Sequence, residues 1–106
     1  MTHPHKIKGN RVEREVVGIH SGRAKRVPLS GAVAEYPGDI EISLRRDING
    51  IPITFNYRGE VKARRNGAGF KTLEGWMGTN DVLFLKRDRQ PFLIVMTEKM
   101  YKELIQ

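Results

Sequence analysis

The fold is decided by residues 39–63, which read DIEISLRRDINGIPITFNYRGEVKA. Apolar and polar side chains alternate on both sides of an Asn-Gly dipeptide at 49–50, and alternation with a period of two predicts β-strands. Asn-Gly between two such runs is the strongest short signal for a two-residue hairpin turn. The stretch therefore predicts a β-hairpin in which Ile48 lies opposite Ile51, and this pairing fixes the register of both strands.

Residues before the hairpin predict a helix and a short strand. A helix over about 11–20 has Asn10 as its cap, and residues 1–9 are expected to form a flexible basic segment. A strand is predicted at 25–29, followed by a loop at 30–38 that is rich in Gly, Pro and Ser.

Residues after the hairpin predict a further helix, two strands and a last helix. The helix covers about 71–77, and the strands at 82–86 and 92–96 are almost wholly apolar, as strands buried on both faces would be. Thr97 is a suitable cap for the last helix. The predicted order is αβββαββα, which belongs to the α/β class.

Composition indicates a polyanionic partner. The 106 residues contain 19 Lys and Arg against 12 Asp and Glu, a formal net charge of +7, which favours nucleic acid before a membrane. No apolar run approaches the roughly 18 residues that a membrane helix needs. The chain has no cysteine, which excludes disulfides, zinc–thiolate sites and cysteine nucleophiles and is typical of the cytoplasm. We therefore expect a cytoplasmic protein with no membrane partner.

Two carboxylates are expected to face one another at the open end of the hairpin. The register places Asp39 opposite Glu60, with Cβ atoms about 5 Å apart, and Lys62 projects from the same face as Glu60. Opposed carboxylates destabilise a sheet unless a cation lies between them, and Mg²⁺ prefers such oxygen ligands. An ordinary ion pair on a solvated strand face is the alternative interpretation.

A third carboxylate lies on the apolar side of the first predicted helix. Helical periodicity puts Glu13 on that side and Glu15 on the opposite one. A carboxylate that faces the core needs a partner, for which a metal ion or a lysine is suitable. The alternative is that Glu13 only completes the helix cap.

Four blocks of the sequence resemble archaeal-type and phage Holliday junction resolvases, in the order of that family. They are KGNRVERE at 8–15, RVPLSGA at 26–32, PGDI at 37–40 and GEVKAR at 59–64. The resemblance implies a restriction-endonuclease-like fold, with a mixed central β-sheet flanked by helices, in a single nuclease domain over 10–106. It also implies a Mg²⁺-dependent, structure-selective DNA endonuclease, with Mn²⁺ as a substitute metal, that nicks four-way junctions as a homodimer.

The resemblance also assigns the site residues by position. It makes Glu13, Asp39 and Glu60 the metal ligands and Lys62 the catalytic lysine. Ser30 is assigned beside the site, with a loop hydroxyl bonded to nearby backbone as its alternative role.

Basic residues around these blocks are expected to bind DNA phosphates as a group, with a solvated surface charge as the alternative role of each one. They are Arg11, Arg14, Lys25, Arg26, Arg64, Arg65 and Lys71. Two alternative functions stay open. One is a nuclease of the same fold that cuts other branched or single-stranded DNA, and the other is a basic DNA-binding module without catalysis.

Overall fold

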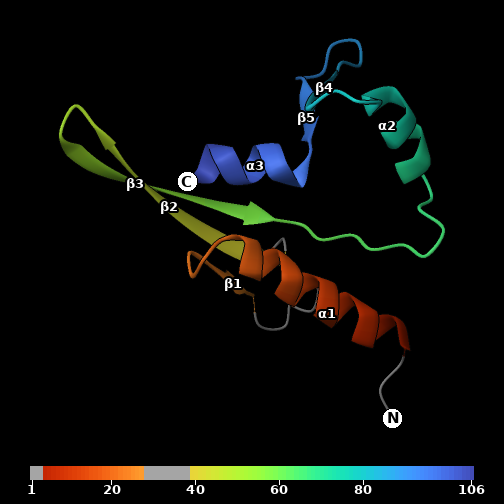
Figure 1. Ribbon diagram of the computed structural model, residues 1–106, viewed down its shortest axis with the longest axis horizontal. Helices are drawn as coiled ribbons and strands as arrows, with labels where there is room; N and C mark the ends of the chain where they lie inside the picture. Colours follow the sequence, from red (N-terminus) through yellow and green to blue (C-terminus); the bar gives the residue numbers. More distant parts are fainter. Residues whose placement is uncertain (1–3, 28–38) are drawn as a thin grey trace. The chain divides into compact units, whose positions relative to one another are not determined.

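A computed structural model describes the backbone of residues 4–27 and 39–106 and, within these ranges, the side chains from residue 11 onward. Its elements follow one another in the order helix, three strands, helix, two strands, helix (Figure 1). The chain is therefore of the α/β class, with helices and antiparallel sheets. It divides into two compact units, Met1–Ala63 and Arg64–Gln106. A single nuclease domain over 10–106 stays a prediction.

The first unit begins with helix α1, Pro4–Ile19. The predicted start near residue 11 is wrong, because residues 4–9 are helical where the sequence predicts a flexible segment, and Asn10 lies inside the helix. Proline is favoured in the first turn of a helix, where its fixed φ suits the helix and its missing N–H needs no partner. After the helix, Ser21 and Gly22 have φ values of 51° and 84°, which reverse the chain toward the first strand.

Three antiparallel strands follow, in the spatial order β1-β2-β3. They are β1, Ala24–Arg26, β2, Ile40–Ile48, and β3, Ile51–Gly59. The predicted register is confirmed, since β2 and β3 pair from Ile48 with Ile51 to Ile40 with Gly59. The Asn-Gly dipeptide at 49–50 forms the turn with φ values of 52° and 81°, as the favoured two-residue hairpin turn requires.

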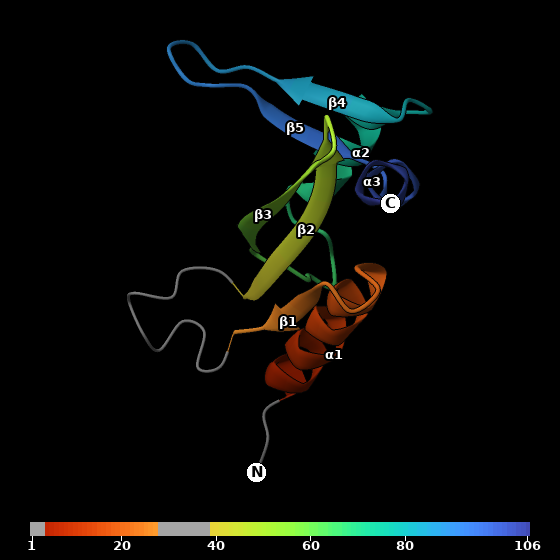
Figure 2. The same cartoon turned by 90° about the vertical axis from the view of Figure 1, so that its left-hand side faces the viewer.

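The core of the first unit lies on one face of this sheet. Ile40, Ile42 and Leu44 alternate along β2 and are buried. Because β1 pairs Ala24 with Ile42 and Arg26 with Ile40, both β1 residues share that face. Helix α1 lies against β1 (Figure 2). The side chain of Arg26 therefore leaves its strand on the packed face of the sheet and not on the solvated face.

The second unit contains two helices and a two-stranded antiparallel sheet. Its elements are α2, Phe70–Met77, β4, Val82–Leu85, β5, Leu93–Met96, and α3, Glu98–Ile105. The predicted cap of the last helix is confirmed, since Oγ1 of Thr97 accepts the backbone N–H of Met100 at 3.2 Å.

The strands of the second unit differ from the prediction in burial. They are not covered on both faces, because Phe84, Leu93 and Ile94 are each more than half exposed.

Within the described residues every strand pairing is antiparallel and the strands form two sheets, where a single mixed sheet is predicted. Two short strands joined by a short turn pair with each other, because parallel neighbours need a long crossover. Apolar composition alone does not distinguish a central strand from such a hairpin.

Candidate functional site

Asp39 lies at the open end of the hairpin, directly before β2, and is held there by backbone and side-chain hydrogen bonds. Its N–H donates to the carbonyl of Gly59 at 2.8 Å, and its own carbonyl accepts the N–H of Val27 at 2.9 Å. Its carboxylate Oδ2 accepts the backbone N–H of Val61 at 2.7 Å. The β2–β3 ladder ends at Gly59, so Glu60 follows just beyond it. The three bonds fix the Asp39 carboxylate beside the segment that carries Glu60.

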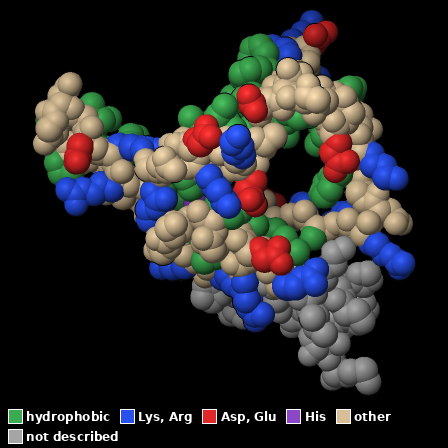
Figure 3. Space-filling view, viewed as in Figure 1, with side chains coloured by type: hydrophobic (Ala, Val, Ile, Leu, Met, Phe, Trp, Pro, Cys, Tyr) green, Lys and Arg blue, Asp and Glu red, His purple; other side chains and the backbone are tan. Residues whose placement is uncertain are grey.

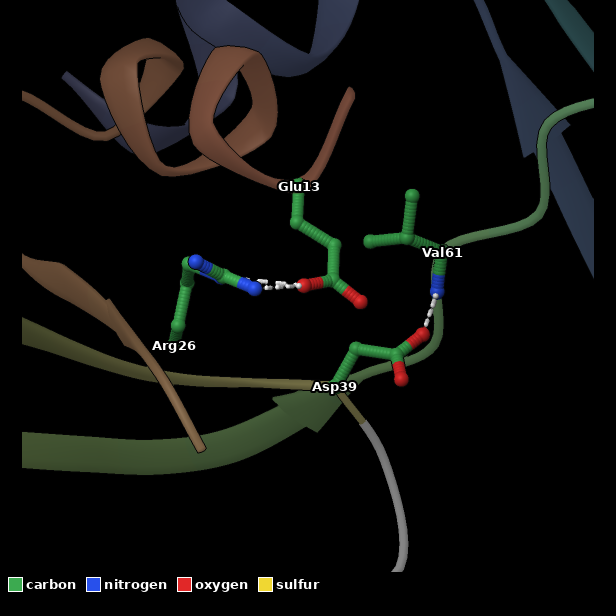
Figure 4. A network of polar contacts seen from close by, with 4 residues as sticks. All are labelled: Glu13, Arg26, Asp39 and Val61. Atoms are coloured by element: carbon green, nitrogen blue, oxygen red, sulfur yellow. Dashed lines mark hydrogen bonds and ion pairs between the residues drawn. The ribbon is translucent and has the colours of Figure 1, made fainter. Parts of the chain in front are cut away.

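Glu13 reaches the same end of the sheet from α1. Its carboxylate Oε2 accepts from both Nε and Nη2 of Arg26, each at 2.9 Å. In Figure 4 one oxygen of Glu13 turns to Arg26 and the other points toward Asp39 and Val61. The Glu13 side chain is only 18% exposed. Two carboxylates, one from the helix and one directly before β2, therefore point toward the same region at the open end of the hairpin (Figure 4).

Glu13 and Glu15 are distinguished as helical periodicity predicts. The Glu15 side chain is 67% exposed and lies 3.9 Å from Arg11 on the same helix. In the structure Glu13 pairs with Arg26 of β1, a partner that was not predicted; a metal ion as its partner stays a prediction. A signal for this pairing exists in the sequence. An arginine that shares a strand face with buried isoleucines needs a carboxylate, and Glu13 is the carboxylate on the facing side of the helix.

Glu60 and Lys62 lie just beyond the end of β3. Their side chains form an ion pair with Nζ and Oε1 3.3 Å apart, and both are more than half exposed. This geometry is compatible with the solvated ion pair as well as with a lysine placed beside a substrate. The remaining predicted site residue, Ser30, lies outside the described residues.

The fit to a divalent cation is partial. Within residues 4–27 and 39–106, no three or more His, Cys, Asp or Glu side chains form a group that could hold a metal ion. Glu13 and Asp39 do offer two hard oxygen ligands, and Mg²⁺ commonly takes only one or two protein carboxylates together with waters and phosphate oxygens. The donor chemistry of these two residues suits Mg²⁺, and coordination of the ion by Glu13, Asp39 or Glu60 stays a prediction.

The predicted DNA-binding residues are spread over both units. In the first, Arg26 is bound to Glu13, Lys25 lies 3.6 Å from Glu41, and Arg11 and Arg14 are exposed on α1. Residues 64, 65 and 71 are exposed in the second unit. Figure 3 shows Lys and Arg side chains distributed over the visible face with Asp and Glu among them. The basic charge is therefore dispersed.

Comparisons give no further assignment: no protein-family model, curated protein or solved structure matches the chain. Among the helices of the described residues, none is long and apolar enough to cross a membrane. The functional argument therefore rests on the chemistry of the side chains around the open end of the hairpin.

Proposed function

We propose that the protein is a Mg²⁺-dependent endonuclease that nicks branched DNA, with four-way junctions as its substrate. In this proposal it has a restriction-endonuclease-like fold and acts as a cytoplasmic homodimer. The observation that carries the proposal is the convergence of Glu13 and Asp39 at the open end of the hairpin, next to the segment that contains Lys62. The net charge of +7 supports a polyanionic substrate.

The proposed roles follow from the positions of the side chains. Glu13 and Asp39 would hold the metal ion, which supplies an activated water and polarises the scissile phosphate. The bond from Val61 keeps the Asp39 carboxylate in one orientation, so little reorganisation is needed when a cation binds. Lys62 directly follows Val61 in the sequence. In the proposal it would break its ion pair with Glu60 and place its ammonium against the negative charge that develops on the phosphate.

The substrate would be recognised through backbone shape and charge. Contacts to phosphates position a protein on DNA without reading its sequence, and dispersed Lys and Arg side chains suit that mode. A resolvase nicks two strands symmetrically, so two copies with one site each are required.

Two matched variants test the proposal. Asp39→Asn should lose cleavage of a four-way junction, whereas Asp47→Asn, which makes the same substitution at the exposed far end of β2, should cut at the wild-type rate. Wild-type protein should cut the junction and leave a plain duplex of the same sequence intact. Calorimetric titration with Mg²⁺ should detect a site that Asp39→Asn lacks and Asp47→Asn keeps. Equal cleavage by the two variants would refute the assignment.

A second candidate is a basic DNA-binding module without catalysis. It is favoured by one observation, that Glu13 and Glu60 are each bound to a cationic side chain of the chain itself. A protein of this kind would bind the junction without cutting it and would show no difference between the two variants in Mg²⁺ titrations.

A further inference from the structure

The β2–β3 hairpin has a polar face on the side of the sheet opposite to the buried core. Directly opposed residues of an antiparallel pair lie on the same face, and the buried residues Ile42 and Leu44 belong to the other face. The pairs on the polar face are Glu41 with Arg58, Ser43 with Asn56, Arg45 with Thr54, and Asp47 with Pro52. All of these residues except Glu41 are exposed. Because burying unpaired polar groups is costly, we expect this face to contact water or a polar ligand.

The outer part of the hairpin is a two-stranded ribbon. Strand β1 pairs with β2 only from Ile40 to Ile42, and one further bond joins the N–H of Ser43 to the carbonyl of Arg23 at 2.8 Å. Beyond that bond, β2 and β3 of the first unit continue as a pair to the turn at 49–50 (Figures 1 and 2). At about 3.4 Å per residue, residues 44–48 extend over roughly 17 Å. The major groove of B-DNA is about 12 Å wide and 8.5 Å deep and admits a two-stranded ribbon, so this ribbon is long enough to enter it.

Basic side chains outnumber acidic ones on the polar face. Strand β1 adds Lys25 opposite Glu41, and Arg23, directly before that strand, lies opposite Ser43. The face then carries four basic residues against two acidic ones, which are Arg23, Lys25, Arg45 and Arg58 against Glu41 and Asp47. Each carboxylate lies beside a cation, with Glu41 3.6 Å from Lys25 and Asp47 4.0 Å from Arg45.

Two of these cations gather beside the base of the ribbon. A hollow of about 320 Å³ there is lined by Arg23, Lys25, Glu41 and Ser43 among others. Contacts from basic side chains to phosphates hold a protein in register on a duplex. The base of the ribbon therefore suits a phosphate at the edge of a groove into which the ribbon reaches.

The side chains along the ribbon are of the kinds that read base edges. Arginine binds guanine through O6 and N7, asparagine binds adenine, and serine or threonine binds either. Arg45 and Thr54 form one cross-strand pair of this kind, and Ser43 and Asn56 form the next. Oγ of Ser43 donates to Oδ1 of Asn56 at 2.6 Å, so the amide NH₂ of Asn56 is the end that can donate to a base. This bond also limits the rotation of both side chains, which lowers the cost of ordering them on a ligand.

We propose that the polar face of the β2–β3 ribbon docks into the major groove of duplex DNA, with Arg45 and Asn56 toward base edges and Lys25 toward a flanking phosphate. Duplex RNA has a deep, narrow major groove that side chains cannot read, so the shape of the ribbon selects DNA. This docking deepens the proposed function, on which the choice of junction arms as the natural substrate rests. It adds base contacts, and therefore a sequence preference, to recognition by backbone shape and charge.

Two adjacent arginines of β2 provide the test. Arg45 lies on the polar face, and Arg46, which is paired with Ile53, lies on the apolar face. Arg45→Gln and Arg46→Gln remove the same charge from the same strand, so any general effect of net charge is equal in both. In anisotropy titrations of a short DNA duplex at low salt without metal, Arg45→Gln should weaken binding at least about fivefold, and Arg46→Gln should leave it almost unchanged. Equal affinities of the two variants would overturn the proposal, provided that their melting curves match that of the wild type.

Chemical protection gives a second measurement that needs no variant. Dimethyl sulfate methylates N7 of guanine, which lies in the major groove, and N3 of adenine, which lies in the minor groove. Saturation of the duplex with wild-type protein should protect guanine N7 and leave adenine N3 reactive. Unprotected guanine N7 would overturn docking in the major groove. A duplex RNA of the same sequence should bind more weakly, and equal affinity for RNA and DNA would show that charge alone drives binding.

Neither experiment measures cleavage, so the two proposals can fail separately. A protein that protects guanine N7 and loses affinity through Arg45→Gln, but cuts no junction with Mg²⁺, would retain the ribbon contact and refute the proposed function. A protein that cuts junctions while Arg45→Gln and Arg46→Gln bind the duplex equally would do the reverse.

Discussion

Replacing Glu13 by Gln tests the centre of the candidate site most directly. The substitution keeps the size of the side chain and removes its charge. In the structure Glu13 is mostly buried and binds two nitrogens of Arg26 through one oxygen. The other oxygen points toward Asp39 (Figure 4). The change therefore removes the charge of one of the two carboxylates that are proposed to bind the metal ion, and it weakens one ion pair.

Both effects have a definite size. A charged group placed to support the transition state contributes roughly 10²- to 10³-fold to the rate, so Glu13→Gln should slow single-turnover cleavage by at least about 10²-fold. A hydrogen bond to a charged group contributes about 1.5 to 3 kcal/mol. Since the Gln oxygen still accepts from Arg26, and that side chain is partly exposed, we expect a loss near 1 kcal/mol. For a domain of this size the melting temperature should fall by roughly 4 to 8 °C.

The assay pairs Glu13→Gln with Glu15→Gln. Glu15 lies two residues along the same helix, is mostly exposed and pairs only loosely with Arg11, so its substitution should change stability by less than about 0.5 kcal/mol and leave cleavage intact. Rates are measured on a four-way junction at saturating Mg²⁺, and melting is followed without metal. Equal cleavage rates for the two variants would refute the role of Glu13. Equal melting temperatures would refute the contribution of its ion pair.

Four further outcomes are expected. Asp39→Asn should preserve or tighten junction binding while cleavage is lost, since it removes negative charge that faces DNA; weakened binding in a gel-shift titration would count against this placement. Lys62→Ala should slow cleavage by about 10²-fold with an unchanged melting curve, because its ion pair is exposed; loss of folding would instead favour a structural ion pair. Junction affinity should fall with salt by about 0.9 log units per log unit of salt for each phosphate neutralised, and a flat response would exclude phosphate contacts. Gly59→Ala brings a Cβ to 2.9 Å from Cγ1 of Ile40 and should cost roughly 1 to 3 kcal/mol in urea unfolding, whereas Gly18→Ala, which meets no atom within 4 Å, should not destabilise the protein.

Local signals account for the parts of the fold that the sequence predicts well. The Asn-Gly turn and the alternation around it fix the hairpin register, because slipping by one residue would turn every apolar side chain to the other face. The start of α1 was harder to predict, since a cap such as Asn10 is a weak preference that a continuing helix overrides. The apolar runs at 82–85 and 93–96 specify strands without specifying their partners, because pairing between strands depends on tertiary contacts.

The difference between local sequence signals and tertiary contacts also decides how much of the candidate site could be predicted. Position along the strands predicts that Asp39 lies at the open end of the hairpin, and periodicity around the helix predicts that Glu13 faces the sheet. Only the family resemblance implies that the two carboxylates share one site. The partner of each carboxylate is a tertiary contact. Arg26 is indicated only by its place on the strand face that carries the buried isoleucines, and the Val61 bond has no signal in the sequence.

The pairing of Glu13 with Arg26 has a consequence for the proposed chemistry. Two converging carboxylates repel one another in the absence of a cation, and the guanidinium of Arg26 offsets part of that repulsion while the site is empty. Glu13, Asp39 and Arg26 together carry one negative charge, so a bound divalent cation would bring the group to one positive charge. That charge matches one phosphodiester. The positive charge of Arg26 is therefore favourable in the proposed site both without and with a bound divalent cation. Arg26→Gln should weaken binding of the metal-loaded protein to a junction. A calorimetric junction titration in Ca²⁺, a hard cation with the same charge, measures this effect, and unchanged affinity would show that the arginine serves only to neutralise Glu13.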